Sequence, residues 1–98
     1  METIYNKETI YDLLKNNFEQ EAVLLIKQIS YYYINYKKDT QGLYNFFNSL
    51  YDDLFYDITF NKIIISKKTI IILEELATPI SSVRLKSKEE YIKKLLGI

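Results

Sequence analysis

The chain has 98 residues, of which 48% are hydrophobic and 27% are charged, a composition typical of one small folded domain rather than a disordered segment. Thirteen basic and thirteen acidic residues cancel, which argues against a dedicated nucleic-acid-binding protein, because such proteins carry a basic excess. Cysteine and histidine are absent, so disulfides, thiolate or imidazole metal ligands and histidine general-base catalysis are excluded.

Two helices are predicted in the first third of the chain. The first covers residues 4–17, with Asn6 as its N-cap. The second covers residues 19–36, because its start, Glu-Gln-Glu-Ala-Val-Leu-Leu, favours helix, although the Tyr-Tyr-Tyr run at 31–33 also suits a strand. The apolar residues at helical spacing are Ile10, Leu13, Leu14 and Phe18 in the first helix and Ala22, Leu25, Ile26, Ile29, Tyr33 and Tyr36 in the second.

The clearest amphipathic helix is predicted over residues 41–58, with Asp39 or Thr40 as its cap. The connection from the second helix is short, so the two helices are expected to be antiparallel neighbours. A face with so many Phe and Leu side chains must be buried. That face comprises Leu43, Phe46, Phe47, Leu50, Leu54 and Ile58, and the opposite side carries Asn45, Ser49, Asp52, Asp53 and Asp57.

A fourth helix is predicted to begin after Ser66, which can cap it, and to stop before Pro79. Ile65 and Ile70 flank this cap at the spacing of a hydrophobic staple. The continuation Leu-Glu-Glu-Leu-Ala at residues 73–77 also prefers helix.

A β-hairpin is the alternative for this segment, because residues 63–65 and 70–72 are runs of isoleucine. A tight hairpin turn requires Gly, Asn or Asp at its centre, however, and the sequence places Lys67 and Lys68 there. The pattern therefore favours the helix over the hairpin.

A short fifth helix is predicted over residues 87–96, after an irregular link at residues 78–86. Ser87-Lys-Glu-Glu90 has the pattern of a capping box, and Gly97 is a suitable C-terminal cap. The predicted fold is all-α, an antiparallel four-helix bundle with a short additional C-terminal helix, in a single domain.

No catalytic or cofactor-binding motif is apparent, so a non-enzymatic protein without cofactor or metal is expected. The two glycines, Gly42 and Gly97, cannot build a phosphate-binding loop. Adjacent residues on a helix diverge by about 100° and do not face each other, so the paired carboxylates are expected on the solvated surface. These pairs are Asp52-Asp53, Glu74-Glu75 and Glu89-Glu90.

The last third of the chain is basic and offers two interpretations. The charged side chains either keep a terminal helix solvated or bind an acidic or membrane-proximal partner surface. Under the second interpretation the candidate partner-binding residues are Arg84, Lys86, Lys88, Tyr91, Lys93 and Lys94.

Targeting signals are not apparent. The longest apolar runs are about four or five residues, far shorter than a membrane span, and the N-terminus lacks the pattern of a signal peptide, so a cytoplasmic location is expected. A DNA-binding regulator is a further alternative, with Lys62, Lys67 and Lys68 contacting phosphates from a helix-turn-helix. The usual tight turn with glycine is missing, so nucleic acid is not the expected partner.

One segment matches a known pattern of spacing. It starts with Asn61-Lys62-Ile63, continues to Ser66-Lys67 and ends in Leu73-Glu74-Glu75-Leu76. This segment resembles the immunity proteins for pediocin-like (class IIa) bacteriocins, in which a helix ends near Asn-Lys/Arg-Ile-x-Phe-Ser/Thr and a helix with Glu-Leu near its end follows. Further positions that fit the resemblance are Ile10-Tyr11-Asp12-Leu13-Leu14, Leu43, Phe46, Leu50, Ile71 and Ile72.

The resemblance covers about residues 5–77 and has two departures. Ile65 stands where an aromatic residue is common, and the tail after Pro79 lacks the Gly-rich turn that several members carry. The second departure falls in the C-terminal half, which chiefly sets the toxin specificity in that family.

The resemblance implies an antiparallel four-helix bundle that protects a bacteriocin producer from inside the cell. Its implied partner is the membrane receptor of a bacteriocin, the mannose phosphotransferase components, with the bacteriocin bound, and its implied effect is to block pore opening. A small helical interaction protein of another kind, such as a phage-encoded inhibitor, would share the same composition and is the alternative.

Overall fold

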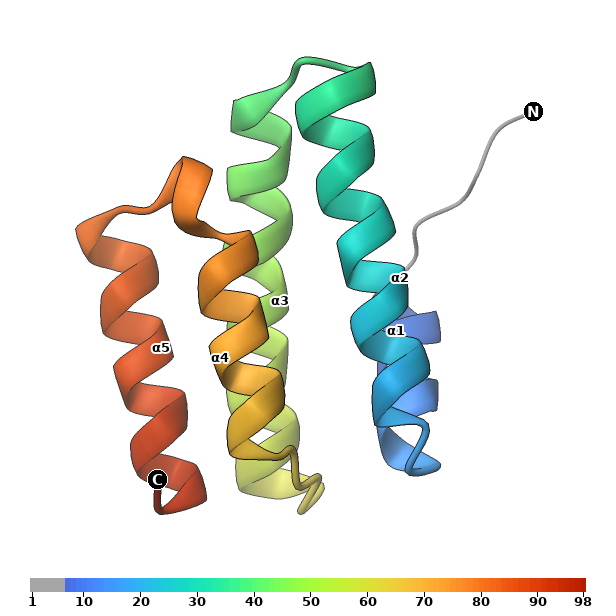
Figure 1. Cartoon of the computed structure of the whole chain (residues 1–98). Coiled ribbons are helices and arrows are strands. Elements are labelled where there is room, and N and C mark those ends of the chain that lie inside the picture. Colours follow the sequence, from blue (N-terminus) through green and yellow to red (C-terminus); the bar gives the residue numbers. More distant parts are fainter. Residues whose placement is uncertain (1–6) are drawn as a thin grey trace.

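The computed structural model describes residues 7–98, and all regular elements within this range are helical (Figure 1). The all-α prediction is therefore confirmed, and the hairpin alternative is wrong. The predicted cap Asn6 lies outside the described residues. The elements are α1 (Lys7–Lys15), α2 (Glu19–Tyr31), the π-helical turn η1 (Tyr32–Tyr36), α3 (Thr40–Phe60), α4 (Lys67–Leu76), the 3₁₀ turn η2 (Thr78–Ile80) and α5 (Val83–Leu96).

The chain reverses direction at each connection, so helices that follow one another in sequence run in opposite directions (Figure 1). α2 packs on α1 and α4, α4 packs on α5, and the most extensive contact joins α3 and α5. α3 and α5 run in the same direction, because Asn48 and Phe55 of α3 meet Lys88 and Tyr91 of α5 in the same order. The helix predicted as a short addition is therefore an integral packing partner of α3.

The apolar face of α3 forms the centre of the core, as its spacing predicts. Leu43, Phe47 and Leu50 are fully buried. Tyr51 is also buried, so the covered face is wider than the predicted stripe, whereas Phe18 is half-exposed and contributes no buried edge to α1. The other helices and their connections complete the core with Ile10, Leu14, Ala22, Ile26, Ile29, Ile63, Ile65, Ile70, Leu73, Ala77, Leu85 and Ile92.

Asp57 lies in the last turn of α3 and is buried, although it was predicted on the side opposite the apolar face. Its carboxylate accepts a hydrogen bond from the side-chain amide of Asn61 at 2.6 Å. Its carbonyl accepts the backbone N–H groups of Asn61 at 2.9 Å and Ile63 at 3.3 Å. Lys62 lies in the left-handed region with φ of 58°, so the chain turns sharply there and leaves the helix.

The connector between α3 and α4, residues 61–66, is extended after this turn. Ile63 and Ile65 point into the core, while Ile64 is 82% exposed. Ser66 caps α4 as predicted, because its hydroxyl accepts the N–H of Thr69 at 3.3 Å. Glu19 of α2 in turn accepts the backbone N–H of Ser66 at 2.7 Å and its hydroxyl at 2.9 Å, which joins the start of α4 to the start of α2.

α5 begins at Val83, four residues before the predicted start at residue 87. Ser82, rather than Ser87, is the N-cap, and its hydroxyl accepts the N–H of Leu85 at 3.2 Å. Leu85 is buried in the core, and this burial favours the earlier start over the local capping-box pattern. The predicted irregular link at 78–86 is therefore mostly helical, and Gly97 ends α5 with φ of 74°, as its position predicts.

The turn from η1 into α3 leaves no room for a side chain at Gly42. Asp39 caps α3 by accepting the Gly42 N–H at 2.8 Å. A Cβ atom added at Gly42 would overlap the Asp39 carboxylate and would lie 2.7 Å from Cε1 of Tyr33.

Replacing Gly42 with alanine is therefore expected to lower the free energy of unfolding by about 1 kcal/mol, because the displaced cap and ring outweigh the higher helix propensity of alanine. Urea denaturation followed by circular dichroism measures this change. Gln41→Ala at the neighbouring exposed position is the control and is expected to stay within about 0.5 kcal/mol of the parent. A stabilised Gly42→Ala protein would show that propensity dominates.

Candidate functional site

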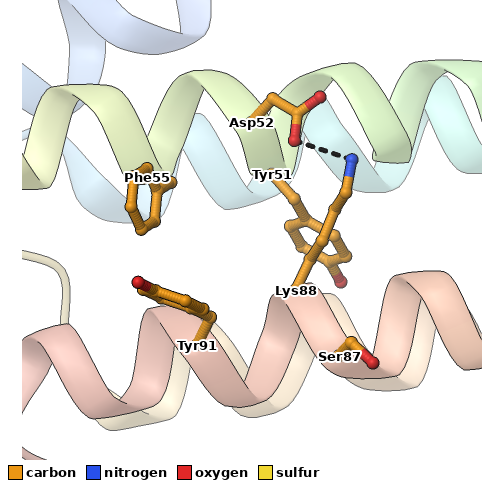
Figure 2. Close-up of a pocket in the computed structure, with 6 residues that line it drawn as sticks. All are labelled: Tyr51, Asp52, Phe55, Ser87, Lys88 and Tyr91. Carbon is orange, nitrogen blue, oxygen red and sulfur yellow. Dashed lines mark ion pairs between the residues drawn. The ribbon is translucent and has the colours of Figure 1, made fainter.

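A hollow of about 290 Å³ lies between α3 and α5 (Figure 2). Both helices contribute residues at i, i+1 and i+4, which lie on one side of an α-helix. The hollow, called here the α3–α5 hollow, contains two of the predicted partner-binding residues, Lys88 and Tyr91. Its lining comprises Tyr51, Asp52 and Phe55 from α3 and Ser87, Lys88 and Tyr91 from α5.

Lys88 forms the polar end of the hollow and ties α5 to α3. Its amine lies 2.6 Å from Oδ1 of Asp52 and donates a hydrogen bond to Oδ1 of Asn48 at 2.7 Å. Figure 2 shows the lysine side chain reaching across from α5 to the Asp52 carboxylate. An ion pair at a partly exposed site contributes modestly to stability, but it fixes how the two helices face each other.

Aromatic rings form the other end of the hollow. Phe55 and Tyr91 meet edge to face, with ring centroids 4.8 Å apart and planes at 73° (Figure 2). Phe55 is half-buried and Tyr91 is exposed, so part of this apolar surface faces solvent. The hollow can therefore accept an apolar or aromatic side chain next to a charged pair.

A buried polar pair lies beside the hollow. The Tyr51 hydroxyl donates a hydrogen bond to Oε2 of Glu89 at 2.6 Å, and both side chains are buried. Burial raises the pKa of Glu89. The pKa of Tyr51 is raised mainly by burial and also by the hydrogen bond to Glu89. Glu89 was expected on the surface with Glu90, and the structure contradicts this prediction for Glu89, while Glu90 is exposed.

Lys93 ties α5 to α4. Its amine lies 2.8 Å from Oε2 of Glu74 and 3.6 Å from Oε1 of Glu90. The hydrogen bond to Glu74 raises the pKa of Lys93 and favours its charged form. Lys93 therefore holds two helices together.

The six predicted partner-binding residues divide into two groups. Lys88, Tyr91 and Lys93 make the contacts with α3 and α4 described above. The other three are exposed and form no ion pair with any residue in the range 7–98; they are Arg84, Lys86 and Lys94. Partner binding by these residues remains a prediction.

Sequence reasoning did not identify Tyr51, Asp52 and Phe55 as part of a site. Their spacing is simply that of neighbours on a helix, and their partners lie more than thirty residues further along the chain. Within residues 7–98, no group of three or more acidic side chains could hold a metal ion, and no helix has the length and apolarity needed to cross a bilayer. Comparison of the chain with protein-family models, curated proteins and solved structures gave no match.

Proposed function

We propose that this protein is an immunity protein for a pediocin-like bacteriocin. In this proposal it binds the mannose phosphotransferase receptor with its bound bacteriocin at the inner side of the membrane and blocks pore opening. Helices α1 to α4 would correspond to the antiparallel four-helix bundle of those proteins, and α5 would be the additional helix. The observation that supports the proposal is the role of the connector at residues 61–66.

Each residue of the connector that matches the immunity-protein pattern has a structural role. Asn61 closes α3 through Asp57, Lys62 makes the left-handed turn, Ile63 enters the core and Ser66 caps α4. The pattern therefore encodes the turn between the third and fourth helices, where a change of spacing would move an isoleucine out of the core. A resemblance in residues that direct the fold supports kinship more strongly than a resemblance in surface residues.

The α3–α5 hollow is the surface that we assign to partner recognition. Its α5 side lies after Pro79, where this chain departs from the immunity-protein pattern, and the hollow combines open aromatic surface with a charged pair. Aromatic residues in a partly covered depression, with polar groups at the rim, are typical of the centre of a protein interface. The exposed cations Arg84, Lys86 and Lys94 on the same helix can steer an acidic partner toward it.

A protection assay tests the function. The protein is expressed in a bacterium that is sensitive to pediocin-like peptides, and the cells are challenged with a panel of these peptides. Resistance to one or a few peptides, with the others still killing, is the expected result. Sensitivity to the whole panel, with the protein folded and abundant, would contradict the proposal and favour an inhibitor of another kind.

The same assay can test whether the exposed cations of α5 take part in partner binding. Replacing Arg84, Lys86 and Lys94 together with alanine is expected to reduce protection, because the partner is no longer steered toward the hollow. Folding should be preserved, because none of the three makes an ion pair with the described part of the chain. The matched control replaces three exposed lysines elsewhere, Lys15, Lys67 and Lys68. Equal protection by the two triple variants would exclude these α5 cations from partner binding.

A further inference from the structure

The end of the molecule where α2 turns into α3 carries a cluster of tyrosines and lysines that the proposed function does not use. Figure 1 shows this turn standing beyond the connection between α4 and α5, so no other element within residues 7–98 covers its far end. We call this cluster the tyrosine–lysine tip. It comprises Lys27, Tyr31, Tyr32, Tyr36, Lys37 and Lys38.

The tip exposes aromatic rings. Tyr31 is 69% exposed and Tyr36 is 76% exposed, although both are large side chains. The Tyr36 ring stacks on Tyr32 with centroids 5.3 Å apart and planes at 23°. A shallow hollow of about 490 Å³ lies among Lys27, Gln28 and these three tyrosines.

The π-helical turn η1 explains this grouping. The N–H of Lys37 bonds to the carbonyl of Tyr32 at 2.8 Å, five residues back rather than four. Such a widened turn changes which residues share one side of the helix, and here Tyr31, Tyr32 and Tyr36 line the same hollow. Single π turns recur at functional sites in helices, and this one sets the position of an exposed aromatic surface.

The charge of the tip is positive in a chain whose formal net charge is zero. Residues 22–38 contain three lysines and no carboxylate, and residues 40–51 contain no charged side chain. Asp39, which lies between these segments, is engaged as the cap of α3. Lys37 and Lys38 are exposed in the connection between η1 and α3.

We propose that the tyrosine–lysine tip docks on a lipid surface that carries anionic headgroups. Tyrosine is enriched at the membrane–water interface, because its ring is apolar and its hydroxyl is polar. Lysines close to an anionic surface add attraction that acts within a Debye length. A single-stranded nucleic acid would need a basic groove that tracks its backbone, whereas the two adjacent lysines here lie on a projecting turn. This inference goes beyond the proposed function, because the tip would contact lipid without toxin or receptor.

Vesicle sedimentation tests the proposal with the purified full chain. Binding is expected to vesicles of phosphatidylcholine mixed with phosphatidylglycerol and not to phosphatidylcholine alone, and it is expected to weaken as salt is added. The Lys37→Gln/Lys38→Gln variant is expected to bind about thirtyfold more weakly, since each lysine near an anionic surface contributes about fivefold. The matched control, Lys67→Gln/Lys68→Gln, changes an exposed lysine pair at the opposite end of the molecule and is expected to bind like the parent (Figure 1).

A tryptophan probe locates the contact. The chain has no tryptophan, so Tyr36→Trp introduces a single fluorophore. Its emission is expected to shift to the blue on addition of anionic vesicles and to be quenched by brominated lipid. Tyr56→Trp on the exposed side of α3 is the control and is expected to show neither effect.

Three outcomes would overturn the inference. They are no vesicle binding by the parent chain, equal loss of binding in the two lysine-pair variants, and binding to an oligonucleotide in place of vesicles. The vesicle experiment contains no bacteriocin or receptor, so its failure would leave the result of the protection assay untouched.

Discussion

Replacing Phe47 with alanine is expected to lower the free energy of unfolding by about 3–5 kcal/mol. The Phe47 ring is fully buried in the middle of α3, and its centroid lies 5.6 Å from that of Phe46 and 5.8 Å from that of Tyr51. Removing the ring leaves a cavity that neighbouring helices can only partly fill, so packing contacts are lost together with the hydrophobic contribution. Urea denaturation followed by circular dichroism measures the change.

Phe60→Ala is the matched control, because it makes the same change on the same helix at a ring that is 64% exposed. This variant is expected to stay within about 0.5 kcal/mol of the parent. Similar losses in the two variants would mean that the apolar face of α3 is not the centre of the core.

Disrupting the buried pair of Tyr51 and Glu89 is also expected to lower the free energy of unfolding substantially. Tyr51→Phe keeps the ring but removes the hydroxyl, which leaves the buried carboxylate of Glu89 without this donor. The expected loss is about 1–3 kcal/mol at neutral pH, because a buried acceptor loses its partner. A parallel Tyr91→Phe change removes a hydroxyl from an exposed ring and is expected to have little effect.

Glu89 is also expected to make stability depend on pH. Burial raises its pKa in the folded protein, so folding is favoured more when the carboxyl is protonated. This contribution is fully present below the usual pKa of glutamate and is lost as the pH rises through the raised pKa of the folded state. The groups that set its environment are Tyr51 of α3, Glu74 of α4, and Lys86 and Lys93 of α5.

Glu89→Gln isolates this titration. The difference in unfolding free energy between the parent and this variant is expected to change in favour of the variant as the pH rises from acid to neutral. The Tyr51 hydroxyl lowers the pKa of Glu89 and partly offsets the effect of burial, so Tyr51→Phe is expected to move the transition to higher pH. A difference between parent and Glu89→Gln that stays constant from pH 4 to pH 8 would contradict this account of the pair.

Local signals were sufficient to predict most helix ends. Asp39, Ser66 and Gly97 each act within a few residues of the helix that they cap, so the sequence around them determines their role. Ser87 and Glu90 have capping-box spacing, so the local sequence predicts a helix start at Ser87, whereas the cap in the structure is Ser82. The burial of Leu85 against the rest of the core favours the earlier start, and that burial depends on contacts distant in sequence.

The lining of the α3–α5 hollow could not be predicted in the same way. The sequence predicts Glu89 on the solvated surface together with Glu90, because its hydrogen-bond partner Tyr51 lies 38 residues away on another helix. The sequence predicts Lys88 and Lys93 as solvated or partner-binding cations, because Asp52 and Glu74 lie on other helices. A single sequence indicates which residues share a helix face, whereas the pairing of faces depends on how the helices pack.

The connector between α3 and α4 has a consequence for the unfolded chain. The runs of isoleucine at 63–65 and 70–72 are β-branched, apolar and free of proline, which are the features of segments that assemble into cross-β aggregates. Lys62 precedes the first run, and Lys67 and Lys68 separate the two runs, so charge interrupts a stretch that would otherwise be strongly aggregation-prone. The lysines that disfavour a hairpin turn thus also act as gatekeepers while the chain is still unfolded.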